Sequence, residues 1–159
     1  MSVPLPKRAA AAAFVLSALL CSDAFAQLVD ASDPARIADA IRELGYRAAV
    51  DADNVGDPLI RSSAGGTDFL IYFFGCKQAQ ACTLLLFKAG YELPEPVTTE
   101  RVNAWNEGTL LGRAYVDENG SAWLEMPLNM DGGISRLNFD DGFDWWEVIL
   151  RQFEEHIGY

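Results

Sequence analysis

Apolar and polar positions along the first third of the chain predict one helix. Asp33 and Pro34 suit a helix start, and Gly45 suits a helix end. The residues between them carry a single apolar stripe at helical spacing: Ile37, Ile41 and Leu44. We therefore expect a helix that buries one side.

The next stretches read as strands, because apolar, β-branched and aromatic residues are grouped between Gly- and Asp-rich turns. These stretches are 46–50, 58–63, 67–74 and 82–89. The Pro-containing segment 92–100 then interrupts the pattern, and Thr98 is placed to cap a short helix with Val102 and Trp105 on one side. The sequence predicts a run of strands followed by a second helix.

The last third predicts a hairpin and a third helix. Two strand-like segments, 112–117 and 121–130, flank Asn119-Gly120, which we expect to form a two-residue turn. The second strand has one apolar face, made of Ala122, Leu124, Met126 and Leu128. The final helix has a clean apolar stripe, made of Phe143, Trp146, Leu150, Phe153 and Ile157. Asp140 and Asp141 suit the positive end of this helix.

The order of these elements indicates the fold class. It reads α-β(n)-α-β-β-α, and helices and strands do not alternate as they do in parallel sheets. We therefore expect an α+β fold, an antiparallel sheet with helices packed on it.

One strand is apolar on both faces. In segment 67–74, Phe69, Ile71 and Phe73 share one parity, while Leu70, Tyr72 and Phe74 share the other. If the helices cover one face of an antiparallel sheet, something else must cover apolar residues on its second face. A second copy of the chain or a protein client would cover it, with Tyr72 near the centre of the contact; alternatively, the linker and terminal segments of the chain itself cover it.

Residues 1–26 read as a secretory signal peptide. A short basic segment precedes an apolar run too short to cross a bilayer as a helix, and Ala24 and Ala26 occupy the small-residue positions of a cleavage site. Leu20 is too bulky for the alternative, acylation at Cys21. We expect cleavage between Ala26 and Gln27, one domain over 27–159, a periplasmic or secreted location, and no stable membrane anchor after cleavage.

The negative net charge of the chain argues against some classes of partner. The chain has a formal net charge of −11, and removal of Lys7, Arg8 and Asp23 with the signal peptide leaves 10 basic and 22 acidic residues. So acidic a surface repels phosphate backbones and anionic lipid, which argues against nucleic-acid and membrane-surface binding.

The signal peptide would remove Cys21 and leave Cys76 and Cys82 as a pair. A zinc site needs about four ligands, a redox dithiol usually has two residues between its cysteines, and a nucleophilic cysteine needs a base, for which the chain offers only His156. A disulfide in an oxidising compartment fits best. Closing so short a loop contributes on the order of 2 kcal/mol.

Other candidate sites have simpler structural explanations. Segment 51–57 resembles the start of a calcium loop, but Val55 and Ser62 stand where oxygen ligands belong, so it reads as a solvated acidic turn. Asn103 and Asn106 share a helix face beside Trp105 and could present amides to a ligand, although such residues more often bond backbone groups. We expect no catalytic residues, metal or cofactor.

The chain resembles the YbjN-like family, described as bacterial sensory transduction regulators. The resemblance covers roughly residues 33–153 and rests on "GDPLI", "FFGC", "VNAWN", "GRAYVDENG" and "DGGIS", of which the "N-A-W-N…GRAY" run is the most specific. It implies a fold similar to type III secretion chaperones, which dimerise and bind extended client segments. It implies no catalytic residues.

Together these observations favour an exported, non-catalytic domain that acts by binding protein, in a regulatory or chaperone-like role. The competing hypothesis is an envelope small-ligand binder or hydrolase that uses the region of Asn103, Asn106, Asp140 and Asp141. A flat apolar sheet face would favour the first, and a deep pocket at those residues the second.

Overall fold

A computed structural model describes residues 28–159, so the predicted signal peptide and the predicted cleavage site lie outside the described residues. The fold is α+β with the predicted element order. In chain order the elements are α1 (Pro34–Glu43), β1 (Arg47–Ala52), β2 (Pro58–Ala64), β3 (Thr67–Phe74), β4 (Leu84–Tyr91), α2 (Thr99–Gly108), β5 (Arg113–Val116), β6 (Ala122–Asn129) and α3 (Arg136–Ile157).

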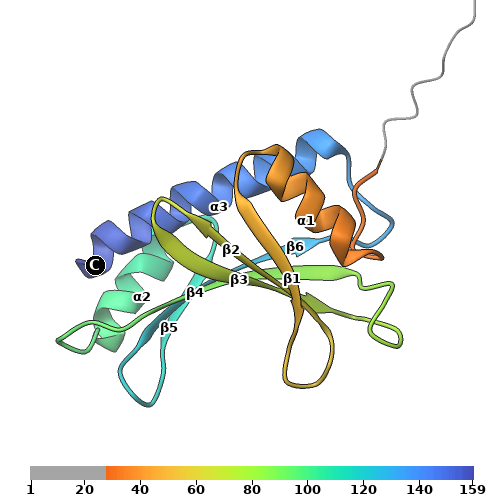
Figure 1. Cartoon of the computed structure of the whole chain (residues 1–159). Helices are drawn as coiled ribbons and strands as arrows, with labels where there is room; N and C mark the ends of the chain where they lie inside the picture. Colours follow the sequence, from red (N-terminus) through yellow and green to blue (C-terminus); the bar gives the residue numbers. More distant parts are fainter. Residues whose placement is uncertain (1–27) are drawn as a thin grey trace, which may run out of the picture.

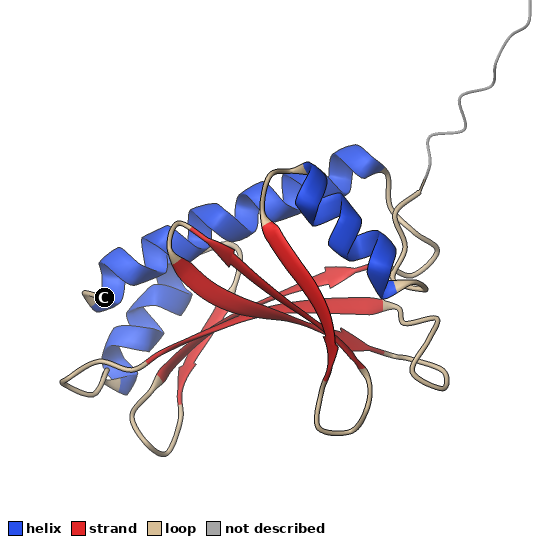
Figure 2. Ribbon diagram, viewed as in Figure 1, coloured by secondary structure: helices blue, strands red, loops and turns tan. Residues whose placement is uncertain are grey.

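The strands form one six-stranded sheet in the order β1-β2-β3-β4-β6-β5, and every neighbouring pair is antiparallel. Figure 1 and Figure 2 show that α1, α2 and α3 all lie on the same side of this sheet. The long α3 runs across it, and α2 covers the end at β5. The described chain thus has two layers, and the second sheet face has no helix on it.

Local signals in the sequence set the helix starts. The side chains of Asp33 and Thr98 accept hydrogen bonds from the backbone N–H groups of Ala35 and Arg101, as expected of N-caps. The start of α3 differs from the prediction. Its N-cap is Ser135, so Asp140 and Asp141 lie in the second turn and no acidic residue lies in the first.

The β5–β6 turn is wider than the two-residue turn predicted at Asn119-Gly120. The backbone N–H of Gly120 donates to the carbonyl of Asp117 at 3.1 Å, and Gly120 takes a left-handed φ of 83°. This is a three-residue hairpin loop with a glycine bulge. The Asp117 carboxylate explains the difference, because it accepts from the backbone N–H groups of Asn119 and Ser121 and so stabilises the wider turn.

The hydrophobic core fills the space between the helices and the sheet. Alternate residues of the central strands point into it: Phe69, Ile71 and Phe73 of β3, Leu85, Phe87 and Ala89 of β4, and Leu124 and Met126 of β6. The α3 stripe meets them with Phe143, Trp146, Leu150, Phe153 and Ile157, as predicted. Within residues 28–159, no helix combines the length and the apolar character that a membrane crossing requires.

Candidate functional site

The sheet face without helices, here called the open face, carries its own apolar cluster. Cross-strand partners share a face, and the register aligns Leu59 with Tyr72, Tyr72 with Leu86, and Leu86 with Pro127. The next row pairs Phe74 with Leu84. These residues form the apolar half of the open face: Leu59, Tyr72, Phe74, Leu84, Leu86 and Pro127.

The apolar half is separate from the core. None of its residues belongs to the connected core cluster of the described residues or packs against it, although Leu59 is itself buried. Leu59 is only 3% exposed, but Phe74 is 44% exposed and Tyr72, Leu84 and Leu86 are half-buried. The rings of Tyr72 and Phe74 lie 6.4 Å apart between centroids. The parity prediction is therefore correct in its geometry: one set of β3 residues faces the helices, and the other faces away from them.

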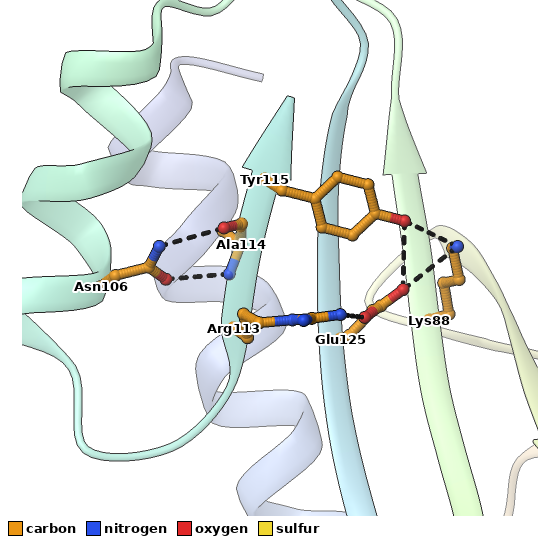
Figure 3. A network of polar contacts seen from close by, with 6 residues as sticks. All are labelled: Lys88, Asn106, Arg113, Ala114, Tyr115 and Glu125. Atoms are coloured by element: carbon orange, nitrogen blue, oxygen red, sulfur yellow. Dashed lines mark hydrogen bonds and ion pairs between the residues drawn. The ribbon is translucent and has the colours of Figure 1, made fainter. Parts of the chain in front are cut away.

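The neighbouring part of the open face is charged. Glu125 of β6 is 5% exposed, and its carboxylate accepts hydrogen bonds from Arg113, Lys88 and Tyr115 (Figure 3). The Lys88 ammonium lies 3.1 Å from Glu125 and donates to the Tyr115 hydroxyl at 2.7 Å. Each member thus has at least one partner of opposite charge or polarity, as burial of a carboxylate requires.

The network shifts the proton affinities of its members. Burial of Glu125 favours its neutral form, but the hydrogen bonds from Arg113 and Lys88 outweigh burial, and the pKa of Glu125 falls below its ordinary value. Burial of Lys88 acts against its charged form, but its hydrogen bonds to Tyr115 and Glu125 outweigh burial and raise its pKa. Glu125 and Lys88 are therefore both ionised at neutral pH.

Two aromatic side chains complete the charged part. The Lys88 ammonium lies 4.6 Å from the centroid of the Trp123 ring, a cation–π distance. Trp123 lies flat over Gly90, where a Cβ atom would come within 2.6 Å of the ring. A hollow of about 410 Å³ opens here, lined in part by Leu70, Lys88 and Trp123. The open face thus offers apolar, aromatic and charged groups on neighbouring strands.

Asn106 closes the β5 edge of the sheet. Its amide accepts from the Ala114 backbone N–H at 2.9 Å and donates to the Ala114 carbonyl at 3.0 Å (Figure 3). This is the pattern a further strand would make, so Asn106 protects the edge from unwanted pairing. Asn103 and Asn106 are both exposed, but the amide oxygen and nitrogen of Asn106 both bond backbone groups. These are the backbone hydrogen bonds that were expected for such an asparagine if it did not bind a ligand.

Trp105 is a packing residue in this structure. It is 5% exposed, and its ring contacts Phe153 and His156 of α3 at centroid distances of 5.1 and 5.7 Å. These contacts lie near the C-terminal end of α3, whereas Asp140 pairs with Arg136 near its N-terminal end. The sixteen positions from Asp140 to His156 span about 24 Å of helix. The asparagines and the aspartates therefore do not form one site.

The remaining acidic segment is a turn. The Asp53 carboxylate accepts from the backbone N–H groups of Val55 and Asp57, both at 2.9 Å, and Asp51 pairs with Arg61. No group of three or more His, Cys, Asp or Glu side chains in residues 28–159 is arranged to hold a metal ion. In the β3–β4 connection, Cys76 and Cys82 are joined by a disulfide.

A family model matches the chain over residues 33–158, which is most of its length. The family is YbjN, described as "Putative bacterial sensory transduction regulator". The chain belongs to the YbjN family. A crystal structure of YbjN from E. coli, described as "a putative transcription regulator", is similar with a TM-score of 0.53 and 20% sequence identity; the match covers 82% of this chain and 89% of that one. At this identity the likeness supports the fold. Among curated proteins, none matches the chain.

The sequence found part of the site of this YbjN-family chain. Strand parity placed Tyr72, and the apolar face predicted for β6 leaves Trp123 and Glu125 on the face opposite Leu124. The network of Lys88, Arg113 and Glu125 was missed, because its members come from three strands whose order is not written in the sequence. One signal was present: Glu125 interrupts a strongly apolar strand, and a carboxylate there needs cationic partners.

Proposed function

We propose that this YbjN-family chain is a non-catalytic regulatory domain that binds a protein partner through its open face. The observation that carries the proposal is the apolar half, a cluster on the sheet side that has no helix over it. An exposed apolar cluster with a polar surround is typical of protein-binding surfaces. The tyrosine and tryptophan at this face are residue types that often anchor such contacts.

The distribution of charge supports the same surface. The open face carries Arg47, Arg61, Lys88 and Arg113 against Asp51, Asp68 and Glu125, and these groups are paired with one another. The face is therefore close to neutral, while the whole chain has a net charge of −11. An acidic chain that meets a partner with its near-neutral face avoids most of its own repulsion.

The proposal includes export. A signal peptide over residues 1–26 would place the domain in the periplasm or outside the cell. Disulfides such as Cys76–Cys82 form and persist in these oxidising compartments. The partner is then an exported protein or a second copy of this chain, and the role is regulatory or chaperone-like. The intact mass of the exported protein tests this part, and we expect an N-terminus at Gln27.

Photo-crosslinking in living cells tests the docking surface. A photoreactive amino acid at position 72 on the open face should capture the partner, whereas one at Leu137, which is 80% exposed on α3, should not. Mass spectrometry then identifies the product as a dimer of this chain or a heterologous complex. The change Leu86→Ser in the same chain should reduce the product at position 72 severalfold, because it removes apolar contact area.

Equal yields at positions 72 and 137, or no product at position 72, would show that the open face binds no protein. A small molecule found in the hollow at Trp123 instead, with no protein product, would move the function to ligand binding.

A further inference from the structure

The β3–β4 connection holds its backbone in an unusual conformation. Gln78, Ala79 and Ala81 have φ values of 54°, 58° and 49°, and they are the only non-glycine residues within 28–159 with a positive φ. A side chain on Cα makes this region unfavourable for L-residues. All three lie in the short segment between Cys76 and Cys82, so the backbone strain of the described chain is concentrated inside the disulfide loop.

The base of this loop is tightly closed. The Thr83 backbone N–H donates to the Phe74 carbonyl at 3.0 Å, and a Cβ atom at Gly75 would lie 2.3 Å from the Thr83 hydroxyl oxygen. Inside the loop, Lys77 and Gln80 exchange two backbone hydrogen bonds. The disulfide closes the loop between these two sets of contacts. Phe74 and Leu84, which face each other at the last rung of the ladder, belong to the apolar half of the open face.

The two sulfurs differ in their surroundings. Cys82 is 4% exposed and belongs to the core, whereas Cys76 is half-buried and packs at the edge of the core. A thiolate from solvent therefore reaches Sγ of Cys76 more easily. Strained disulfides are reduced more readily than relaxed ones, because opening the bond releases the strain.

We propose that the Cys76–Cys82 disulfide is a reversible redox switch for the open face. A thiolate of a small thiol or a protein dithiol attacks Sγ of Cys76, forms a mixed disulfide and releases Cys82 as a thiolate, which takes up a proton. A second thiolate then attacks the sulfur of the reductant and releases Cys76. The net change is two electrons and two protons gained by the protein, and one disulfide formed in the reductant. A disulfide oxidant reverses it.

Opening the bond frees Gln78, Ala79 and Ala81 to leave the left-handed conformation, and the Phe74–Leu84 end of the apolar half loses a restraint. The consequence for partner binding rests on the function proposed above. The chemical behaviour of the disulfide does not depend on that function. The redox switch and the docking function can therefore be refuted separately.

Equilibration with mixtures of reduced and oxidised dithiothreitol tests the switch, and two glutamines of the loop provide a matched comparison. Gln78 has a positive φ, and Gln80 does not. Glycine at position 78 removes the penalty in the oxidised form, so Gln78→Gly should make the disulfide harder to reduce by about fivefold or more. Gln80→Gly adds the same chain flexibility to the reduced form but relieves no strain, and it should have a much smaller effect of opposite sign.

Hydrogen exchange gives the second readout. Reduction should speed amide exchange in residues 72–76 and 82–86, while exchange in α3 should stay unchanged. The Cys76→Ser/Cys82→Ser double variant should match the reduced protein. Equal reduction equilibria for the two glycine variants would overturn the proposal. Equal amide exchange rates in residues 72–76 and 82–86 of the oxidised and reduced proteins would also overturn it. If position 72 gives no crosslinked product in either redox state, the docking function is refuted and the redox chemistry of the disulfide is not.

Discussion

Leu85 and Leu86 are neighbours in β4, yet they belong to two different environments. Leu85 is 0% exposed and faces the helices, where Leu128 of β6 is its cross-strand partner. Leu86 faces the open side between Tyr72 and Pro127 and is half-buried. The same residue type thus contributes to the core on one face and to a surface cluster on the other. Under the function proposed above, stability and binding are divided between the two faces of one sheet.

The two faces also handle polarity differently. On the helix side, the buried Phe69, Phe87, Phe143 and Trp146 rings contact one another at centroid distances of 5.4 to 6.3 Å. On the open side, buried Glu125 is held by a network of charged and hydroxyl groups. An apolar interior gains stability from packing, whereas fixed charges beside an apolar cluster are suited to selecting a partner.

The largest expected difference comes from truncating the two neighbouring leucines. Leu85→Ala should lower the free energy of unfolding by about 2–5 kcal/mol, because it leaves a cavity in the core. Leu86→Ala should lower it by about 1 kcal/mol, because the site is already in contact with water. Urea titration at low protein concentration measures both. Equal losses would mean that the open face contributes to folding as the core does.

Removing the Glu125 charge should have an intermediate effect. Glu125→Gln should lower the free energy of unfolding by about 1–2 kcal/mol at pH 7, because Lys88 and Arg113 lose their counter-charge. Asp68→Asn, at an exposed ion pair with Arg47, is the control and should change little.

The Glu125 contribution should also vanish in acid. The pKa of Glu125 is lowered on folding, so its stabilisation is complete above the ordinary glutamate pKa and is lost as the pH falls through the folded value. Wild-type stability should therefore approach that of Glu125→Gln as the pH drops below about 4.5. A gap between the two proteins that stays constant well below pH 4.5 would rule out this account of the network.

On the helix side, pH should act at the alkaline end, with the smallest effect. Tyr46 donates a hydrogen bond to Glu147 at 2.7 Å, and this bond, helped by burial and the charge of Glu147, raises the pKa of Tyr46 to about 12. The unfolded chain loses this proton near pH 10, so stability should fall as the pH rises from about 10 to 12. Because Tyr46 is only half-buried, the fall should be modest. The Tyr46→Phe variant should show a smaller fall, and the part that remains comes from Tyr91, whose pKa is raised by burial.

Much of the helix side could be predicted from the sequence, because its signals are local. The Asp33 and Thr98 caps and the α3 stripe all depend on residues within a few turns of one another. The start of α3 was placed too late, because Ser135 was not recognised as its cap. The hairpin loop was predicted one residue too short, since the bonds of the Asp117 carboxylate were not considered.

The open face was predictable only in part. Strand parity within β3 showed that two apolar sets exist, which is again a local signal. Which residues surround Tyr72 depends on strand order and register, which long-range pairing decides. The strained φ values of the β3–β4 loop were also out of reach, because Gln78, Ala79 and Ala81 carry no sequence signal for a left-handed conformation.

Side-chain footprinting tests most directly whether a partner covers the open face of the sheet. Covalent labelling of purified, dilute protein should modify Tyr72, Phe74 and Leu86 on the open face, and also Leu137 on α3. The same labelling in cells that produce the chain should leave Leu137 as reactive as before, while the three open-face residues become protected by the partner. Unchanged labelling of Tyr72, Phe74 and Leu86 in cells would contradict the account, because it would show that the open face meets water where the protein acts.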